Sequence, residues 1–215
     1  MFMDSIDRLA QYVLKTKVLV QVCSTFSGEI KVEENIFGRK LIVGNTTQSI
    51  MNRRGREKGV WKSMVPNVEV KFALILGNGG GTVASLLLKK YPRIRISSYE
   101  IDPEIVKISK EFFNTNNDID LHVVDARESF KDGKSYDFII IDLYKGSSYL
   151  GFTDTVEFIN QVKNKLKTPG IAVFNRIPLF ESKSKVAIFK DDLNKVFKDI
   201  KINKSGSNRL YWVTK

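Results

Sequence analysis

Hydrophobic positions change their spacing along the chain, which separates a short first part from a longer second part. Residues 4–14 place their apolar side chains three and four positions apart, a spacing that predicts a short helix. Over residues 17–43 apolar and polar positions alternate between glycine-containing breaks, which predicts a small antiparallel sheet. Residues 44–45 and 52–59 predict loops, and residues 66–67 predict a linker.

From residue 68 onward, strand patterns alternate with helix patterns. This alternation predicts an α/β fold in which a mostly parallel, seven-stranded sheet carries helices on both faces. We therefore predict two domains, residues 1–66 with the small sheet and residues 67–215 with the α/β fold. The predicted strands are residues 71–76, 94–99, 119–124, 138–141 and 171–174, then 200–203 and 210–213 as a terminal antiparallel hairpin, and the predicted helices are residues 82–90, 103–113, 127–130, 153–166 and 183–197.

The balance of charge raises the question of a nucleic-acid partner. The 215 residues include 35 Lys and Arg against 24 Asp and Glu, so the net charge is +11, and positive charge attracts nucleic acid. The lysines of residues 183–204 alternate with apolar residues at helical spacing, however, as on the solvated face of an amphipathic helix. No zinc-finger spacing or RNA-binding aromatic motif accompanies them. A nucleic-acid partner is therefore the less favoured interpretation.

The number of cysteines and the length of the apolar runs indicate the cellular compartment that we expect for the protein. Cys23 is the single cysteine, so no internal disulfide points to an oxidising compartment. Two acids in the first seven residues speak against an export signal, and no apolar run approaches the ~20 residues that cross a bilayer. We expect a cytoplasmic protein with no membrane partner and no metal site.

Two polar features follow neighbouring strands of the predicted α/β sheet. Residues 77–81 include Gly77, Gly79 and Gly81 and lie between a strand and a helix. Glycines at this place let the backbone turn sharply and approach a ligand. Glu100 ends the next strand, where an acid accepts hydrogen bonds from ribose hydroxyls. The two features together predict a nucleoside site.

Two further strand ends add acids to the same edge of the sheet. Asp125 and Ala126 follow the third strand, where a carboxylate and a backbone amide reach an adenine edge, and Asp125 also suits a helix cap. Asp142 follows the buried run 138–141, where a carboxylate is costly unless it is paired, capping or used in chemistry. We interpret Asp142 as functional.

A dinucleotide competes with this interpretation. Residues 79–84 satisfy the relaxed G-x-G-x-x-A pattern, and Glu100 also suits the ribose of NAD. A single match of this kind is weak, and a dinucleotide site needs neither Asp125 nor Asp142. The chain also offers no second domain for a hydride acceptor.

In combination, five stretches are typical of one family. They are Gly38-Arg39-Lys40-Leu41-Ile42-Val43 with Gln48, Leu74-Ile75-Leu76-Gly77-Asn78-Gly79-Gly80-Gly81, Tyr99-Glu100-Ile101-Asp102, Asp125-Ala126-Arg127 and Ile139-Ile140-Ile141-Asp142. Over residues 36–213 the chain resembles the spermidine synthase-like (polyamine aminopropyltransferase) branch of the S-adenosylmethionine-dependent methyltransferase fold. Ile75 stands where most methyltransferases carry an acid, and aminopropyltransferases share this departure.

The resemblance implies a role for each predicted site residue. Gln48, Glu100, Asp125, Ala126 and the glycine loop would hold the nucleoside of S-adenosylmethionine or of its decarboxylated form, with methylthioadenosine as product. Asp142 would be the general base that deprotonates an amine acceptor. The resemblance also implies a homodimer that pairs through its N-terminal sheet.

The predicted acceptor pocket departs from that family. Aminopropyltransferases use several carboxylates for a polycation, whereas this chain has Gly80 inside the glycine loop and Lys145 three positions after Asp142. Tyr144 and Lys145 belong to an Asp-x-Tyr-x-Gly turn of less characterised relatives, and we expect both to line the acceptor site. Trp61, which stands near a motif position of the family, is expected to pack or to stack on a substrate.

The sequence leaves three functions open. The leading hypothesis is a spermidine synthase-like transferase that moves an aminopropyl group to an amine, with a degenerate polyamine pocket. The first alternative is methyl transfer from S-adenosylmethionine to a small or anionic acceptor, which Lys145 suits. The second alternative is a non-catalytic nucleoside- or nucleic-acid-binding protein that kept the fold.

Overall fold

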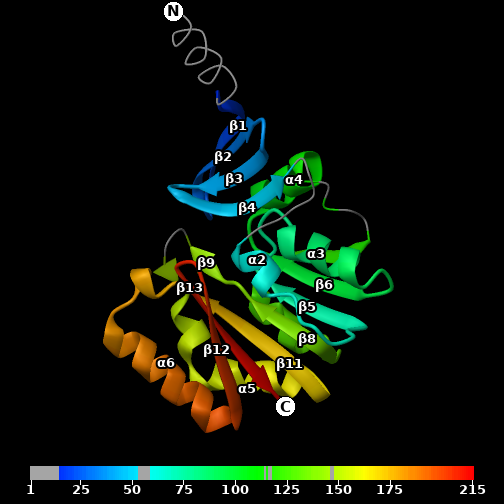
Figure 1. Ribbon diagram of the computed structural model, residues 1–215, viewed down its shortest axis with the longest axis vertical. Helices are drawn as coiled ribbons and strands as arrows, with labels where there is room; N and C mark the ends of the chain where they lie inside the picture. Colours follow the sequence, from blue (N-terminus) through cyan, green and yellow to red (C-terminus); the bar gives the residue numbers. More distant parts are fainter. Residues whose placement is uncertain (1–14, 53–58, 114, 116–117, 146–147) are drawn as a thin grey trace, which may run out of the picture.

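A computed structural model gives the fold and describes residues 15–52, 59–113, 115, 118–145 and 148–215. The helix predicted for residues 4–14 lies outside the described residues. The chain forms a small antiparallel sheet above a larger α/β unit (Figure 1). The α/β fold that the alternating pattern predicts is therefore confirmed, including the sheet that precedes it.

The small sheet has one strand more than the sequence predicts. Its strands pair antiparallel in the order β1-β2-β3-β4. The fourth strand was missed because its side chains are mostly polar and show no alternation. The strands are β1 (Lys17–Ser24), β2 (Gly28–Asn35), β3 (Gly38–Val43) and β4 (Thr46–Asn52).

The large sheet has the order β12-β13-β11-β8-β5-β6-β7. Its strands are parallel from β7 to β11, and β13 pairs antiparallel with both β11 and β12, so the predicted terminal hairpin is confirmed. Its strands are β5 (Phe72–Leu76), β6 (Arg95–Glu100), β7 (Ile119–Val123), β8 (Tyr136–Ile141), β11 (Leu166–Arg176), β12 (Asp199–Ser205) and β13 (Asn208–Thr214).

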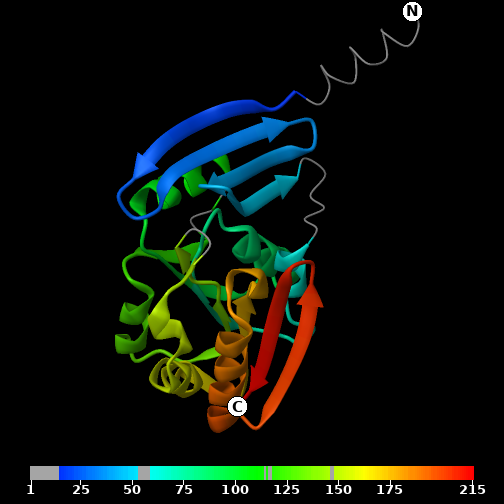
Figure 2. The same ribbon diagram turned by 90° about the vertical axis from the view of Figure 1, so that its left-hand side faces the viewer.

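Helices cover both faces of the large sheet. On one face α5 and α6 pack with η1 against side chains such as Leu76, Ile141 and Phe174. On the other face α2 and α3 pack against Ile75 and Ile140. The turned view in Figure 2 shows α6 and the red hairpin along the lower part of the molecule. The helices are α2 (Val60–Ser63), α3 (Thr82–Lys90), α4 (Pro103–Phe112), α5 (Val156–Lys165), α6 (Lys183–Val196) and the short 3-10 helices η1 (Ala126–Lys131), η2 (Gly151–Asp154) and η3 (Pro178–Phe180).

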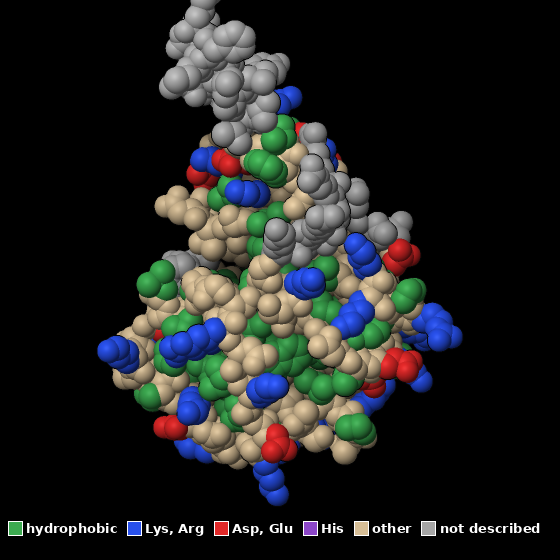
Figure 3. All heavy atoms as spheres, in the orientation of Figure 1, with side chains coloured by type: hydrophobic (Ala, Val, Ile, Leu, Met, Phe, Trp, Pro, Cys, Tyr) green, Lys and Arg blue, Asp and Glu red, His purple; other side chains and the backbone are tan. Residues whose placement is uncertain are grey.

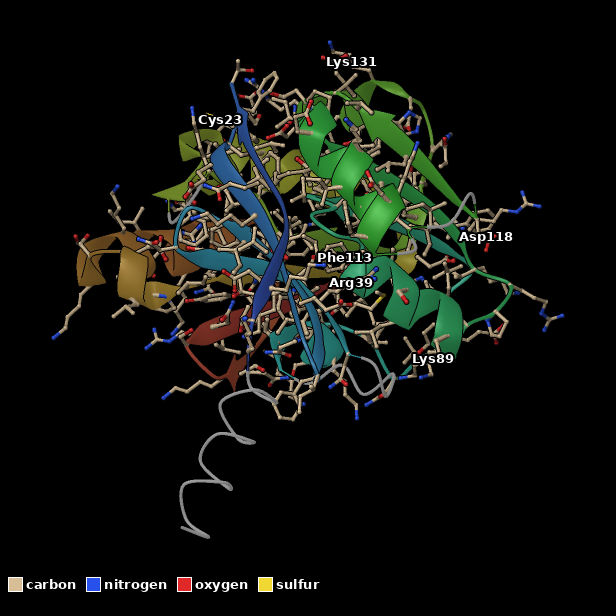
Figure 4. The ribbon with its side chains drawn as sticks, turned by 90° about the horizontal axis from the view of Figure 1, so that it is seen from above. Cys23, Arg39, Lys89, Phe113, Asp118 and Lys131 are labelled. Atoms are coloured by element: carbon tan, nitrogen blue, oxygen red, sulfur yellow. The ribbon has the colours of Figure 1, made fainter. Side chains whose placement is uncertain are left out.

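Helix α4 carries the small sheet. Apolar side chains of β2 and β3 pack against its face and against Phe113, which follows it. Arg39 of β3 donates a hydrogen bond to the carbonyl oxygen of Phe112 at 3.1 Å. Figure 4 looks down on this contact, with Arg39 and Phe113 labelled. The small sheet is thus fixed over one end of the large sheet.

A second attachment of the small sheet reaches the glycine loop itself. The N–H of Gly80 donates to Ser49 Oγ at 2.7 Å, and Thr82 Oγ1 lies 3.3 Å from the Ile50 nitrogen, which donates to it. Both Ser49 and Ile50 belong to β4. The strand that the pattern failed to predict therefore positions residues beside the predicted nucleoside site.

None of the helices in the described part of the chain is long and apolar enough to span a bilayer. On the face drawn in Figure 3, Lys and Arg side chains are spread out and gather in no single patch.

Candidate active site

The site lies where the strand order of the large sheet reverses. The chain runs from β5 outward to β6 and β7, and then returns to place β8 on the other side of β5. In sheets of this kind, ligands bind beyond the carboxyl ends of the strands at the point of reversal. Gly77 follows β5 and Asp142 follows β8, and the Asp142 N–H donates to the carbonyl oxygen of Leu76 at 2.8 Å. The glycine loop and the predicted base are therefore neighbours.

A cavity of about 380 Å³ opens at this point. Its lining comes from the small sheet, from the ends of β5, β6 and β8, and from the segment after β10. All predicted site residues except Gly81 line it. The lining residues that the sequence predicted are Gln48, Trp61, Gly77, Gly79, Glu100, Asp125, Ala126, Asp142, Tyr144 and Lys145.

The backbone N–H groups of the four glycines in the loop already donate within the protein, so the loop offers a ligand close backbone contact and few free hydrogen-bond donors. The N–H of Gly77 donates to the Tyr99 carbonyl oxygen at 3.0 Å, and that of Gly81 donates to the Asn78 carbonyl oxygen at 2.9 Å. The N–H of Gly79 donates to Glu100 at 3.0 Å, and that of Gly80 is held by the small sheet. Pyrophosphate sites use such N–H groups for the ligand. The loop therefore suits the uncharged sugar of a nucleoside better than a pyrophosphate.

Close approach explains why glycine stands at position 77. Its φ is +91°, and a Cβ there would lie 2.1 Å from the carbonyl oxygen of Asp142. The ends of β5 and β8 thus meet with no room for a side chain between them. Gly81 is also left-handed, with φ +77°, and precedes α3, so it shapes the start of the helix from outside the cavity.

Glu100 ends β6 with its carboxylate anchored on the backbone. Its Oε2 accepts from the Gly79 N–H at 3.0 Å and its Oε1 accepts from the Asp102 N–H at 3.2 Å. Burial raises the pKa of Glu100, and the backbone N–H of Gly79 and that of Asp102 work against the rise. Each oxygen keeps a further lone pair for a donor such as a ribose hydroxyl.

Asp125 combines the two roles that the sequence allowed. Its Oδ1 accepts from the backbone N–H of Arg127 at 2.8 Å and so caps η1. The Arg127 guanidinium pairs with Asp125 Oδ2 at 2.8 Å, which lowers the pKa of Asp125. The same guanidinium lies over the Phe152 ring, 4.7 Å from its centroid. Asp125, Arg127 and Phe152 form one wall of the cavity.

Asp142 lies partly buried in the cavity, next to an amide that the sequence did not single out. Asn175 Nδ2 donates to Asp142 Oδ1 at 2.8 Å. Burial raises the pKa of Asp142 to about 6, against a lowering by the Asn175 hydrogen bond. The carboxylate is thus a stronger base than an ordinary aspartate and remains ionised at neutral pH.

Tyr144 presents its ring to the cavity, because its hydroxyl is used inside the protein. The Ile177 N–H donates to Tyr149 Oη, and Tyr149 Oη lies within hydrogen-bond distance of Tyr144 Oη, 2.9 Å away. The Tyr144 hydroxyl in turn donates to the carbonyl oxygen of Asn175 at 3.0 Å. Burial raises the pKa of Tyr144 far above its ordinary value. Tyr144 therefore acts as an apolar wall.

The small sheet explains the missing acid in the glycine loop. A Cβ at Gly80 would lie 2.6 Å from the Cβ of Ser49 and 2.7 Å from its Oγ. The hydroxyl of Ser49 fills the space that a larger residue at position 80 would occupy. Lys145 lies exposed in the short strand β9 (Tyr144–Lys145), which pairs with β10 (Ser148–Tyr149). Among the described residues, no three histidine, cysteine or acidic side chains lie close enough to hold a metal ion.

Sequence reasoning missed several residues of the site. Phe26 and Ser27 come from the turn between β1 and β2, and Leu150 and Phe152 from the segment after β10. No local pattern marks these four, because loops of different parts of the chain bring them to the cavity. Asn175 carried a usable signal, since it is a polar residue that follows an apolar run at the carboxyl end of a strand beside β8.

The fold and site define a methyltransferase-like α/β protein whose cavity suits a nucleoside. The model of the spermine/spermidine synthase domain matches residues 62–205. The chain belongs to the spermine/spermidine synthase family, so the resemblance seen in the sequence is confirmed.

Relatives extend over different lengths of the chain. A polyamine aminopropyltransferase of Vibrio vulnificus is 33% identical over 51% of this chain and 38% of its own length. A probable polyamine aminopropyl transferase of Bifidobacterium longum is 34% identical over 48% of this chain, which spans only 23% of that relative. A polyamine aminopropyltransferase of Prochlorococcus marinus (strain CCMP1986 / NIES-2087 / MED4) is 27% identical over 92% of this chain and 74% of its own length.

Solved structures show the same fold at low identity. Spermidine synthase from Thermotoga maritima has a TM-score of 0.75 at 16% identity, over 93% of this chain and 73% of that one. Human methyltransferase-like protein 13 in complex with SAH has a TM-score of 0.60 at 19% identity, over 66% of this chain and 71% of that one. The Rossmann-like methyltransferase fold is thereby confirmed.

Proposed function

We propose that the protein transfers an alkyl group from a sulfonium nucleoside to an amine, with the aminopropyl group of decarboxylated S-adenosylmethionine as the leading donor. The observation that carries the proposal is the placement of Asp142, a carboxylate with raised pKa, against the glycine loop in the same cavity as Glu100. Family membership supports aminopropyl transfer over other chemistry on this fold.

The proposed reaction needs one proton transfer and one displacement. Asp142 takes a proton from the acceptor ammonium, which frees the lone pair on nitrogen. The nitrogen then attacks the carbon beside the sulfonium, the carbon–sulfur bond breaks, and its electron pair remains on sulfur in neutral methylthioadenosine. The product is a secondary ammonium. Positioning of both reactants in one cavity supplies much of the remaining rate.

The donor is tested by calorimetric titration with S-adenosylmethionine, its decarboxylated form and methylthioadenosine. We expect methylthioadenosine and the decarboxylated form to bind more tightly than the intact form. Preference for intact S-adenosylmethionine would instead support methyl transfer. Absence of binding to all three would overturn the proposed function.

Glu100 is the residue we propose for the ribose. Glu100→Gln replaces one acceptor oxygen by an NH₂ donor, which opposes the backbone N–H groups of the glycine loop and leaves one fewer acceptor for the ribose hydroxyls. We expect at least about a tenfold loss of methylthioadenosine affinity. The matched control is Glu157→Gln, an exposed residue of α5. Equal affinity of the two variants would remove Glu100 from the binding site.

The acceptor end of the cavity favours an amine without a second positive charge. Asp142 is the acid there, Tyr144 contributes a ring, and Lys145 adds a cation at the rim. The space at Gly80 is filled by Ser49. This arrangement is also the observation that favours the second candidate, methyl transfer to a small or anionic acceptor, because Lys145 attracts such an acceptor and repels a polycation.

Lys145→Asp reverses that preference. We expect the KM for 1,4-diaminobutane, used as a probe, to fall by about tenfold, because a repulsion is replaced by an attraction. Lys190→Asp makes the same change of charge on the exposed face of α6 and serves as control. Steady-state kinetics with decarboxylated S-adenosylmethionine measures both. An unchanged KM in Lys145→Asp would show that Lys145 does not face the acceptor.

A further inference from the structure

Behind Asp142, on the side of the terminal hairpin, two amide side chains follow each other. Asn175 lies in β11 and Asn208 is the first residue of β13. Both are buried, at 6% and 9% exposure. Buried amides need hydrogen-bond partners, so their use of donors and acceptors is informative.

The two amides form a directed chain that ends on Asp142. Asn208 Nδ2 donates to Asn175 Oδ1 at 2.8 Å, and Asn175 Nδ2 donates to Asp142 Oδ1 at 2.8 Å. The oxygen and nitrogen of an amide are bonded to the same carbon and point in different directions within one plane, so a donor that binds the oxygen favours the orientation in which the NH₂ group points elsewhere. The donor from Asn208 and the acceptor on Asp142 therefore both favour the orientation in which Asn175 turns its NH₂ group, and not its oxygen, toward Asp142.

We propose that Asn175 is a positioning residue for Asp142, and that Asn208 holds the Asn175 amide in the orientation that this role requires. The inference rests on the proposed function, in which Asp142 is the base. The donor on Oδ1 fixes the plane of the carboxylate and favours its ionised form. Among the described residues Asp142 Oδ2 has no hydrogen-bond partner, so it is the oxygen that receives the proton of the acceptor.

A reversed Asn175 amide would have the opposite effect. Its oxygen would then face the carboxylate oxygen of Asp142, and two acceptors in contact favour the protonated acid. An Asp142 that is already protonated cannot take a proton from an ammonium. The orientation that Asn208 imposes thus keeps the base available at neutral pH.

Other titratable groups around Asp142 do not replace this effect. The hydroxyls of Tyr144 of β9 and Tyr149 of β10 are hydrogen-bonded to each other, and burial raises their pKa values. Arg176 of β11 is paired with Asp154 and Glu181. Lys145 lies exposed at the rim. Among the residues that the structure describes, the amide of Asn175 is the group in hydrogen-bond contact with the carboxylate.

The test is a carbon-13 NMR titration of aspartate-labelled protein, which needs no acceptor, with the Asp142 signal assigned from its absence in Asp142→Asn. In Asn175→Ala we expect the Asp142 midpoint to move about one pH unit higher, because a hydrogen bond to the charged form is lost. Asn208→Asp should move it upward as well, because a carboxylate at position 208 draws the Asn175 NH₂ group toward itself and turns its oxygen to Asp142.

A double-mutant cycle separates the reversed amide from the added charge. In the Asn175→Ala background, Asn208→Asp should move the midpoint much less than it does alone. Asn203→Ala, at an exposed asparagine of β12 in the same hairpin, should leave the midpoint unchanged. Unchanged midpoints in both Asn175→Ala and Asn208→Asp would overturn the inference, as would equal effects of Asn208→Asp in the two backgrounds.

Kinetics distinguish failure of this inference from failure of the proposed function. With decarboxylated S-adenosylmethionine and 1,4-diaminobutane, Asn175→Ala should lose about fivefold in kcat/KM at pH 6 and much less at pH 9. A transfer rate that is unchanged in Asp142→Asn would remove the base itself. A rate that falls in Asp142→Asn, together with a wild-type pH profile in Asn175→Ala, would overturn only the positioning role.

Discussion

Asp142→Asn should abolish transfer and at the same time stabilise the fold at neutral pH. Removal of the base should lower kcat by about 10²–10⁴-fold, the usual contribution of a general base. Methylthioadenosine affinity should stay within about twofold, because the product carries no group that Asp142 deprotonates. Steady-state kinetics and calorimetry measure the two effects. A variant that keeps its transfer rate would rule out Asp142 as the base.

The gain in stability follows from the sign of the pKa shift. Burial raises the pKa of Asp142 from 3.8 to about 6, so the unfolded chain loses this proton at lower pH than the folded protein does. The folded state is therefore penalised increasingly as pH rises from about 4 to 6, and the penalty remains above that range. Asparagine has no such penalty, so the variant should gain about 2 to 3 kcal/mol in unfolding free energy at pH 7 and nothing at pH 3.

Asp137, near the start of β8, provides a control of opposite sign. Burial works to raise its pKa, but the Lys167 ammonium and the backbone N–H groups of Phe72 and Lys71 outweigh burial and lower it. Its stabilisation is present above the ordinary pKa and is lost as pH falls. Asp137→Asn should therefore lower the free energy of unfolding at pH 7. Urea unfolding measures this change. Destabilisation by both variants at pH 7 would contradict the cost assigned to Asp142.

Gly77→Ala should lower both the free energy of unfolding and the affinity for the nucleoside. The left-handed φ of +91° already penalises a Cβ by about 1–2 kcal/mol, and the contact of 2.1 Å with the Asp142 carbonyl oxygen forces the ends of β5 and β8 apart. We expect a loss of about 3–5 kcal/mol in unfolding free energy. Methylthioadenosine binding should fall below detection, because the loop that we propose for the nucleoside moves with the strand end.

Gly133→Ala is the control that separates the penalty of a positive φ from the steric contact of an added Cβ. Gly133 also has positive φ, at +67°, but a Cβ there would meet nothing within 4 Å. This variant should lose about 1–2 kcal/mol and keep its nucleoside affinity. Urea unfolding and calorimetry compare the two. Similar losses in both variants would show that the close approach of β5 and β8 does not matter.

Local pattern was sufficient for most of the fold. Apolar runs and amphipathic stretches predicted the strands and helices of the α/β unit. Each of these elements buries one face, so its apolar residues recur at the spacing of a helix or a strand. The pattern failed at β4, whose polar side chains carry no such period, and at the two-residue strands β9 and β10. These strands form through hydrogen bonds to their partner strands: β4 pairs with β3, and β9 pairs with β10.

The sequence by itself determined the acids and glycines of the site, because strand ends of a parallel sheet meet at one edge and polar residues there stand out against apolar runs. Glu100, Asp125 and Asp142 were predicted in this way. Only the tertiary structure decided how these groups are used. Ser49 fills the space at Gly80, the Tyr144 hydroxyl is used inside the protein, and the amides of Asn175 and Asn208 are aligned behind the base. The physical reason is register: a hydrogen bond between residues 33 positions apart depends on how β11 pairs with β8 and β13, and no local period encodes that pairing.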